Sequence, residues 1–483
     1  MHSQNYQNAE YSALLYYIEA CIRSYTLSCD IMDKFPLFYP LHLHILNKIT
    51  TFAAKISEKS PKKSITMVFD RNLYLQKLIS ADGNGMIKII TGIRRCGKSF
   101  LLFELFKNYL LEQGIQVDHI IQINLEDRRN KRLRNPDTLL EYIDSQLKDQ
   151  NKYYIFLDEI QLVPEFEDVL NSYLHIPNAE VYVTGSNAKF LSKDVITEFR
   201  GRGWEIRVRP LSFAEYYEGI GGDKRDALQD YYAYGGLPAV TLLPSAEEKI
   251  SYLKEMYHTI YFRDIVDRNR LHNEEGLELT LQVLASSMGA TINPSKIANT
   301  FKSAANIKMS ANTISKYLEH LKDSFMVSEA MRYNIKGRKY IGADSKYYFE
   351  DPGIRNAILG FRQMENSHMM ENVLYNELCS RGYSVDVGLV EIWEKGADGK
   401  NKHKKLEVDY VINRGSQRIY IQSAYMMSDA DKVAQEQRPL INIKDSFRKV
   451  IISGDYGGKF YNNEGVLRIG VFDFLFDTHC LDE

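Results

Sequence analysis

A glycine-rich loop lies between an apolar strand pattern and a helical pattern in the first half of the chain. Residues 92–99 read Gly-Ile-Arg-Arg-Cys-Gly-Lys-Ser, which satisfies every fixed position of the pattern G-x-x-x-x-G-K-[ST]. The apolar run 86–90 precedes the loop, and the run 100–106 follows it with helical spacing. A chance turn rarely carries all four fixed residues and both flanks, so the segment predicts a strand–loop–helix unit that binds phosphate groups.

The residues of this loop have distinct expected roles. Gly92 and Gly97 let the backbone wrap closely around an anion, so that its N–H groups point at phosphate oxygens. Lys98 is expected to reach the β- and γ-phosphates of ATP, and the Ser99 hydroxyl is expected to bind Mg²⁺. The predicted nucleotide-binding residues of the loop are Gly92, Ile93, Arg94, Arg95, Cys96, Gly97, Lys98 and Ser99.

Two acids stand at the end of a later apolar strand pattern. The run 153–157 is apolar and leads directly into Asp158 and Glu159. Beside a phosphate loop, Asp158 would hold Mg²⁺ and Glu159 would orient the attacking water. The alternative is a strand end that only places its charges in solvent. The position downstream of the loop favours the catalytic pair.

Polar and basic residues mark the next two strand patterns. Ser186 and Asn187 follow the fourth expected strand, where either could contact the γ-phosphate or cap the following helix. Arg200 and Arg202 precede the strand pattern 204–208. Of the two, Arg202 is favoured to stabilise charge on the transferred phosphoryl group, within the chain or across a subunit interface. The alternative is an arginine that faces solvent or forms a structural ion pair.

Strand and helix patterns alternate from residue 67 to about 209. This alternation predicts an α/β fold with a parallel sheet that is covered by helices on both faces. The expected strands are 87–90, 119–125, 153–157, 180–184 and 204–208, and the expected helices are 98–113, 137–149, 165–174 and 189–199. Residues 1–66 are either a small helical N-terminal extension or an artefact of start-site choice, with a linker at 57–64 as the boundary.

Composition limits the partners and the compartment. The chain has 483 residues, too many for one core, and its net charge is −2, so any contact with DNA must come from a local basic patch. Its five cysteines lack metal-ligand spacing, and their odd number predicts reduced thiols in the cytoplasm. No apolar run approaches the length of a membrane span, and the N-terminus lacks the features of a secretory signal.

Several short motifs together resemble the prokaryotic AAA+-type P-loop ATPases with a C-terminal region of unknown function. The resemblance covers residues 67–483, through 91–99, 156–161, 184–186, 201–202, 210–213 and 234–238. It implies an ATPase core at 67–209, a helical lid at 210–270, a winged-helix domain at 271–362 and a restriction-endonuclease-like domain at 363–483. In related ATPases a Gly-x-Pro turn lies where the lid meets the nucleotide, which implies that position for Pro238. The alternative for this turn is a helix stop.

The middle segment contains two helical patterns joined by a turn, at 297–299 and 310–321. The apolar face of the second pattern leaves a polar face that suits a recognition helix in the DNA major groove. A basic strand-like tail follows and would contact phosphates as a wing, through Arg332, Lys336, Arg338, Lys339 and Lys346. The alternative is the same fold used for protein contacts or for lid support.

The C-terminal segment carries part of a nuclease pattern. Glu371 begins an amphipathic helical run, and Asp409 lies on an apolar strand pattern. Active nucleases of the implied shape carry Glu-x-Lys on the next strand, where this chain reads Gln422-Ser423-Ala424. One carboxylate is thus an amide and the lysine is missing, which predicts an inactive nuclease fold that binds nucleic acid or protein. The basic loop 400–405 is either a phosphate contact or a solvated loop.

Taken together, the sequence predicts an ATPase that hydrolyses ATP with Mg²⁺ and couples its nucleotide state to the binding of DNA or a protein partner. The expected catalytic residues are Glu159, Asp158, Arg202 and Ser186, and the expected Mg²⁺ ligands are Ser99 and Asp158. Two alternatives stay open: an ATP-regulated DNA-binding regulatory or defence protein with little turnover, and a nuclease. No membrane partner is expected, and the oligomeric state is open.

Overall fold

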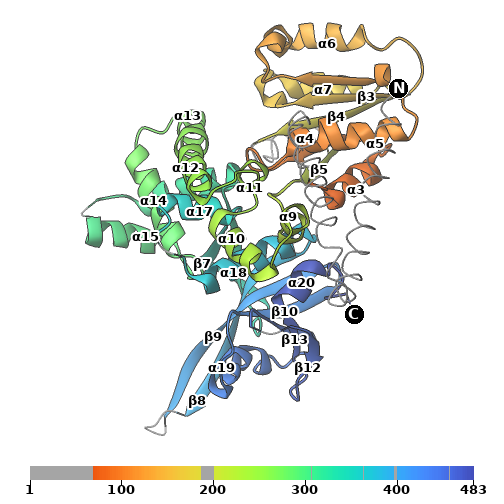
Figure 1. The fold of residues 1–483 in the computed structure, drawn as a ribbon. Helices are drawn as coiled ribbons and strands as arrows, with labels where there is room; N and C mark the ends of the chain where they lie inside the picture. Colours follow the sequence, from red (N-terminus) through yellow and green to blue (C-terminus); the bar gives the residue numbers. More distant parts are fainter. Residues whose placement is uncertain are drawn as a thin grey trace, which may run out of the picture. The chain divides into compact units, whose positions relative to one another are not determined.

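The glycine-rich loop follows the second-outermost strand of a parallel five-stranded sheet, which has the order β2-β3-β4-β1-β5 (Figure 1). The computed structural model describes residues 69–186, 201–305, 307–362, 364–395, 400–455 and 457–482. The strands are β1 (Ile87–Thr91), β2 (Ile120–Asn124), β3 (Tyr153–Asp158), β4 (Ala179–Gly185) and β5 (Gly203–Arg207). All five predicted strands are therefore present, each within one residue at either end. The N-terminal extension and the helix expected at 189–199 lie outside the described residues.

Alternating side chains of the sheet pack into two separate layers. On one face, Ile155 and Leu157 of β3 join a core with α6 (Pro136–Asp144) and α7 (Phe166–Tyr173). On the other face, the ring of Phe106 lies 5.7 Å from that of Phe156 and 4.9 Å from that of Tyr182. Successive residues of a strand point to opposite faces, so an almost wholly apolar strand such as β3 requires cover on both sides. The predicted α/β fold with two helical layers is confirmed.

The helix after the glycine-rich loop is continuous but changes its winding. It runs through α4 (Lys98–Phe100), a π-helical segment (Leu101–Phe106) and α5 (Lys107–Glu112), close to the predicted 98–113. The helix predicted at 137–149 is shorter, because α6 ends at Asp144. The polar residues that follow form a turn instead, in which the backbone N–H of Lys148 donates to the hydroxyl of Tyr153 at 3.0 Å.

Helices dominate the chain from residue 213 to residue 323. A capping box formed by Ser212 and Glu215 begins the first of them. The helices are α9 (Phe213–Ile220), α10 (Lys224–Tyr234), α11 (Pro238–Thr241), α12 (Ala246–Met256), a π-helical segment (Tyr257–Phe262), α13 (Arg263–Asn269), α14 (Glu274–Ser286), α15 (Pro294–Thr300), a second π-helical segment (Phe301–Ala305) and α16 (Ala311–Asp323). Within the described ranges, no helix is long and apolar enough to cross a lipid bilayer.

A second sheet of eight strands includes residues from both the middle and the C-terminal segments. Its order is β12-β13-β11-β10-β9-β8-β6-β7. The strands are β6 (Val327–Asn334), β7 (Lys339–Phe349), β8 (Ser384–Lys395), β9 (Asn401–Arg414), β10 (Gln417–Ala424), β11 (Arg448–Ser453), β12 (Lys459–Tyr461) and β13 (Leu467–Gly470). The helices with this sheet are α17 (Pro352–Ile358), α18 (Asn366–Ser380), α19 (Ala430–Ile441) and α20 (Val471–Phe476).

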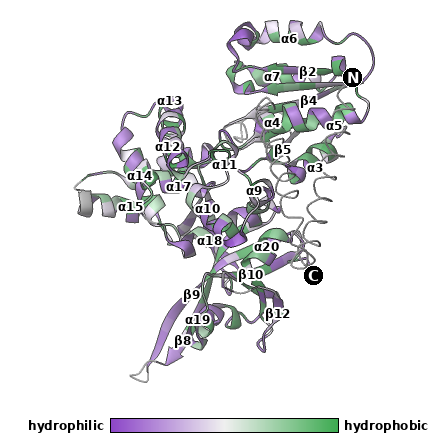
Figure 2. Cartoon of the chain, in the orientation of Figure 1, coloured by the Kyte–Doolittle hydropathy of each residue, from purple (hydrophilic) through white to green (hydrophobic). Residues whose placement is uncertain are grey.

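The β6–β7 hairpin is the point where these two segments join. Strand β6 pairs with β7 in antiparallel register and with β8 in parallel register, where Arg332 lies opposite Val387. A boundary at residue 362 therefore does not separate two independent sheets. The far part of the β8–β9 hairpin is hydrophilic, whereas the buried strands around it are hydrophobic (Figure 2).

Candidate functional site

The glycine-rich loop is held against the end of β5. The backbone N–H of Val208 donates to the carbonyl of Thr91 at 2.8 Å, and a β-carbon placed on Gly92 would lie 2.0 Å from the carbonyl oxygen of Val208. Gly92 also has a φ of 143°, a backbone conformation that other residues rarely adopt. This close approach explains why the first fixed position of the loop is glycine.

Replacing Gly92 by alanine should therefore disrupt the loop. We expect the variant to lose at least ~2 kcal/mol of unfolding free energy and most of its nucleotide affinity, because the added methyl group overlaps the backbone of Val208. Gly85→Ala is the matched control, since Gly85 also has a positive φ but has nothing within 4 Å of an added β-carbon. Urea unfolding and fluorescent-nucleotide titration measure both effects. Equal losses in the two variants would contradict the steric explanation.

Lys98, Ser99 and Asp158 come together at the ends of β1 and β3. The ammonium of Lys98 donates to the carbonyls of Gly92 at 2.9 Å and Ile93 at 3.1 Å, so the loop holds it in place. The Ser99 hydroxyl donates to Oδ1 of Asp158 at 2.8 Å. A hydroxyl and a carboxylate this close fit the oxygen ligands that Mg²⁺ prefers. A cavity of about 420 Å³ opens beside Lys98 and Ser99.

A hydrogen-bond network fixes the two acids of the site. Thr184 donates its hydroxyl to Oδ1 of Asp158 at 2.6 Å and accepts from the backbone N–H of Glu159 at 3.0 Å. Oε2 of Glu159 accepts from the Ser186 hydroxyl at 3.2 Å and from the amide of Gln161. Burial raises the pKa of Asp158, while the hydrogen bonds from Thr184 and Ser99 act in the opposite direction. Ser186 therefore contacts the candidate base, whereas Asn187 lies outside the described residues.

Helices α12 and α13 and the π-helical segment between them contact the loop through residues that the sequence analysis did not single out. The hydroxyl of Tyr252 on α12 accepts from the Arg95 guanidinium at 2.5 Å. Tyr261 donates to the carbonyl of Arg94 at 2.9 Å, and Asp264 of α13 lies 3.6 Å from the Arg94 guanidinium. These contacts link residues about 160 positions apart in the chain. No local pattern distinguishes Tyr252 or Tyr261 among the 33 tyrosines of the sequence.

Pro238 lies next to the loop. A β-carbon placed on Gly97 would be 3.9 Å from Cγ of Pro238, the first residue of α11. Just before it, the backbone N–H of Gly236 donates to Oδ2 of Asp351 at 2.8 Å. The turn at 235–238 therefore connects the glycine-rich loop with the segment that follows β7.

Arg202 lies at the other end of the sheet. Its carbonyl accepts from the backbone N–H of Ile87, the first residue of β1, while the glycine-rich loop follows the last residue, Thr91. Four residue steps along a strand span about 13 Å, at about 3.3 Å per residue. The geometry gives no support to a role of Arg202 within its own chain, so contact across a subunit interface stays the prediction. Arg200 lies outside the described residues.

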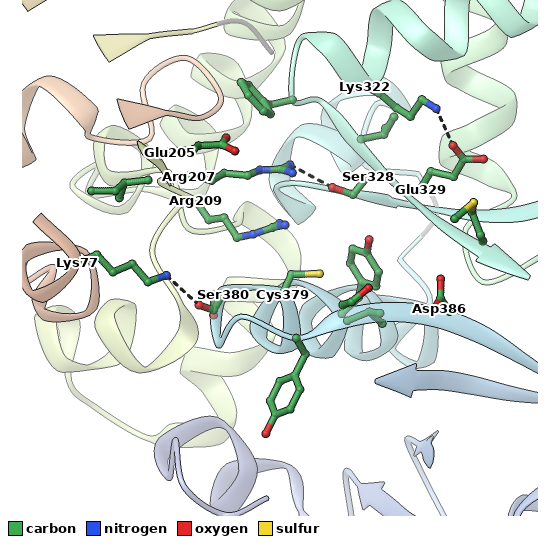
Figure 3. A pocket seen from close by; sticks show the side chains of 18 of the residues that line it. Lys77, Glu205, Arg207, Arg209, Lys322, Ser328, Glu329, Cys379, Ser380 and Asp386 are labelled. Atoms are coloured by element: carbon green, nitrogen blue, oxygen red, sulfur yellow. Dashed lines mark hydrogen bonds and ion pairs between the residues drawn. The ribbon is translucent and has the colours of Figure 1, made fainter. Parts of the chain in front are cut away.

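A buried ion-pair cluster links β5 to the second sheet. Oε2 of Glu350, a fully buried residue, lies 3.1 Å from Arg207 and 2.8 Å from Arg209. Arg207 also donates to the Ser328 hydroxyl at 3.2 Å, at the rim of a cavity of about 890 Å³ where β5, β6 and α18 meet (Figure 3). Across this cavity, Lys77 donates to the carbonyl of Ser380 at 3.4 Å.

Asp351 gives the protein a testable pH dependence. Burial raises the pKa of its carboxyl from 3.8 to about 7, against the lowering effect of backbone N–H groups that include Gly236 and Ile354. The folded state then retains a proton that the unfolded chain releases near about pH 4, so the free energy of unfolding should fall as the pH rises to about 7. Asp351→Asn should flatten this slope in urea unfolding at about pH 5 and about pH 7. An unchanged slope would contradict the assignment.

The expected DNA-contacting helix has the predicted division of faces. Ile314, Tyr317, Leu318 and Leu321 of α16 are buried, and Ser310 caps the helix by accepting from the backbone N–H of Thr313. The basic tail differs from the prediction at two residues, because Arg332 is half-buried and lies 3.4 Å from Asp344, and Lys346 is buried. Lys336, Arg338 and Lys339 are exposed, but Lys346 is 1% exposed and points into a cluster of carboxylates. Lys346 was thus wrongly predicted to contact phosphates, because β7 turns its side chain into the core.

Comparison with known proteins identifies the family. A family model described as an AAA domain matches residues 84–217, and a domain of unknown function (DUF8612) matches residues 225–365. An uncharacterized protein of Haemophilus influenzae is 33% identical over 419 residues, which span 84% of this chain and 98% of that protein. An uncharacterized protein of Methanocaldococcus jannaschii is 28% identical over 403 residues, which span 80% of this chain and 85% of that protein.

The chain belongs to the same family as the Haemophilus influenzae protein, and its residues 84–217 match an AAA domain. Among solved structures, the Aeropyrum pernix ORC1 protein in complex with DNA is 15% identical with a TM-score of 0.27, over 62% of this chain and 94% of that chain. AMPPCP-bound DnaA from Aquifex aeolicus is 12% identical with a TM-score of 0.27, over 51% of this chain and 85% of that chain. Likeness at these scores supports no conclusion about partners.

Proposed function

We propose that this protein hydrolyses ATP with Mg²⁺ at the glycine-rich loop and that its nucleotide state controls the binding of a DNA partner. The observation that carries the proposal is the grouping of Lys98, Ser99 and Asp158 around the loop, with Glu159 fixed beside them. Phosphoryl transfer needs little covalent chemistry from the protein, so positioned charges and a positioned water supply most of the catalysis. This set of side chains supplies both.

Each side chain has a defined task in this proposal. Lys98 exchanges its two loop carbonyls for phosphate oxygens when ATP binds. Ser99 and Asp158 would hold Mg²⁺, which neutralises charge on the phosphates when it is bound. Glu159 orients the attacking water, and its contacts with Ser186 and Gln161 set the direction of the carboxylate. Arg202 is assigned to a neighbouring subunit's site.

A continuous set of contacts supports coupling between the nucleotide and the C-terminal sheet. Pro238 lies beside Gly97 of the loop, and Gly236, two residues earlier, donates to Asp351. Asp351 directly follows Glu350, which holds both Arg207 and Arg209. A shift of the lid turn when ATP binds would therefore act on the residues that join the two sheets. The physical basis is an element with two arrangements whose balance the nucleotide changes.

Two exposed basic regions favour DNA as the partner. The turn between β6 and β7 carries Lys336, Arg338 and Lys339, all exposed, close in sequence to α16. On the β8–β9 hairpin, the ring of Trp393, which is 66% exposed, lies 4.9 Å from that of His403. Exposed lysines flank His403 on β9. Basic side chains beside an exposed aromatic ring fit phosphates and unstacked bases.

An ATPase assay on the full chain, with and without duplex DNA, tests the proposal. We expect DNA to raise turnover several-fold, and we expect Lys336→Ser/Arg338→Ser/Lys339→Ser to weaken DNA binding and reduce the salt slope by about 0.9 per lost phosphate contact. Lys224→Ser/Arg225→Ser on α10 is the control with a similar loss of exposed charge. DNA binding without turnover would instead favour a regulatory protein. Turnover that DNA leaves unchanged, with no DNA binding, would contradict the DNA part.

A further inference from the structure

Three carboxylates of the C-terminal region converge on one ammonium group. Nζ of Lys346 lies 2.9 Å from Oε1 of Glu371, 2.8 Å from Oε1 of Glu407 and 3.4 Å from Oδ1 of Asp409. Lys346 comes from β7, Glu371 from α18, and the other two acids from β9. The side chain of Lys346 is only 2% exposed. An ammonium has three donors, so one lysine can serve three carboxylates at once.

The cluster is also enclosed by neutral groups. The Tyr348 hydroxyl donates to Oε1 of Glu371 at 2.7 Å, and the backbone N–H of Ser423 donates to Oδ2 of Asp409 at 2.9 Å. Gly289 lies near the second oxygen of Glu371. A β-carbon placed on Gly289 would lie 3.2 Å from Oε2 of Glu371 and 2.5 Å from the ring of His368. Gly289 therefore lies close to this carboxylate, whereas the side chain of Glu407 stays 33% exposed.

Charge balance requires a cation at this point. Buried carboxylates that lie close together repel one another, and removing them from water costs several kcal/mol unless an opposite charge and hydrogen bonds compensate. Nζ of Lys346 lies within 3.4 Å of an oxygen of each of Glu371, Asp409 and Glu407. The lysine on β7 therefore supplies the positive charge opposite acids from two other elements, α18 and β9.

The resemblance to nucleases would place a divalent metal at Glu371 and Asp409, but the donor set does not fit one. Nζ of Lys346 is within ion-pair distance of both acids. Across the described residues, no group of three or more His, Cys, Asp or Glu side chains is arranged to hold a metal ion.

We propose that the ammonium of Lys346 takes the place of a divalent cation between Glu371 and Asp409. The lysine occupies the space between the two acids, so these acids bind no metal ion. The β7 lysine then joins the hairpin to α18 and β9, and the C-terminal region contacts its partner without cleaving it. This inference concerns a site separate from the glycine-rich loop and does not depend on ATP turnover.

A Mn²⁺ titration of the nucleotide-free full chain tests the proposal, with binding followed by electron paramagnetic resonance and calorimetry. Every protein carries Asp158→Asn, so that the acid beside the glycine-rich loop adds no Mn²⁺ signal. We expect no saturable site with Lys346 present. Lys346→Met should gain one saturable site, and adding Asp409→Asn should abolish it. Lys322→Met, which breaks a partly exposed ion pair with Glu329, is the control and should gain none.

Two results would overturn the proposal. One is a saturable Mn²⁺ site with Lys346 present that Glu371→Gln removes, because the acids would then hold a metal beside the lysine. The other is a folded Lys346→Met variant, verified by circular dichroism, that gains no Mn²⁺ site. If Lys346→Met does not fold, the titrations with and without Glu371→Gln still decide the question.

Discussion

Replacing Lys98 by alanine is expected to lower ATP turnover by at least ~100-fold and to weaken nucleotide binding, because the other two cations of the loop, Arg94 and Arg95, contact Asp264 and Tyr252 instead. The hydrogen bonds of Lys98 to the carbonyls of Gly92 and Ile93 hold its ammonium inside the loop. Lys107→Ala, on the same continuous helix but bonded to Gln122 instead, is the matched control and should keep turnover within about twofold. Phosphate release and fluorescent-nucleotide titration measure the two effects.

The companion variant Glu159→Gln separates binding from chemistry. It keeps an oxygen that can accept from Ser186, but it removes the charge that orients and activates water. We expect nucleotide affinity to stay within about threefold and turnover to fall by at least ~100-fold. Unchanged turnover in both Lys98→Ala and Glu159→Gln would disprove hydrolysis at this site. Loss of nucleotide binding in Glu159→Gln alone would mean that the acid has a structural role.

The second large effect concerns the link between the two sheets. Glu350→Ala is expected to lower the free energy of unfolding by about 3–5 kcal/mol, because it leaves the buried Arg209 and the partly buried Arg207 without their shared carboxylate. Glu274→Ala removes one acid of an exposed pair with Arg263 and should cost less than about 1 kcal/mol. Urea unfolding measures both values.

Glu350 also provides a test of coupling. If the contact between β5 and the second sheet transmits the nucleotide state, Glu350→Gln should reduce the effect of DNA on turnover more than it reduces basal turnover. The amide keeps the shape of the side chain but loses the charge that holds both arginines. Equal loss of basal and DNA-stimulated turnover would mean that Glu350 acts through stability alone.

The parallel sheet was predictable because its signals are local. The loop 92–99, the apolar strands and the acids at 158 and 159 lie in short stretches; the five strands end within one residue of the expected positions, and Ser99 contacts Asp158. Ser186 was predicted near the γ-phosphate, and the structure shows its contact with Glu159. The position of Arg202 also follows from the predicted parallel sheet, because a residue that precedes a parallel strand lies at the end of the sheet opposite a loop that follows a neighbouring strand.

The lid and the C-terminal region were less predictable because their contacts are long-range. Tyr252 and Tyr261 reach the loop from about 160 residues away, and a tyrosine on a helix has no pattern that indicates such a contact. Lys346 was grouped with the basic wing because its neighbours in sequence are basic and aromatic. The pairing of β6 with β8 brings β7 next to Glu371 and Asp409. No local sequence pattern predicts this long-range pairing.

The shared sheet has a consequence for how the chain is made. The ribosome synthesises strand β6 long before its partner β8. During this interval the backbone groups of β6 that later pair with β8 have no partner. A natural or engineered truncation at residue 362 would remove β8 altogether. The unpaired edge of β6 could then pair with a strand of a second copy of this chain. We expect such shortened chains to aggregate during synthesis, whereas full-length chains should remain in solution.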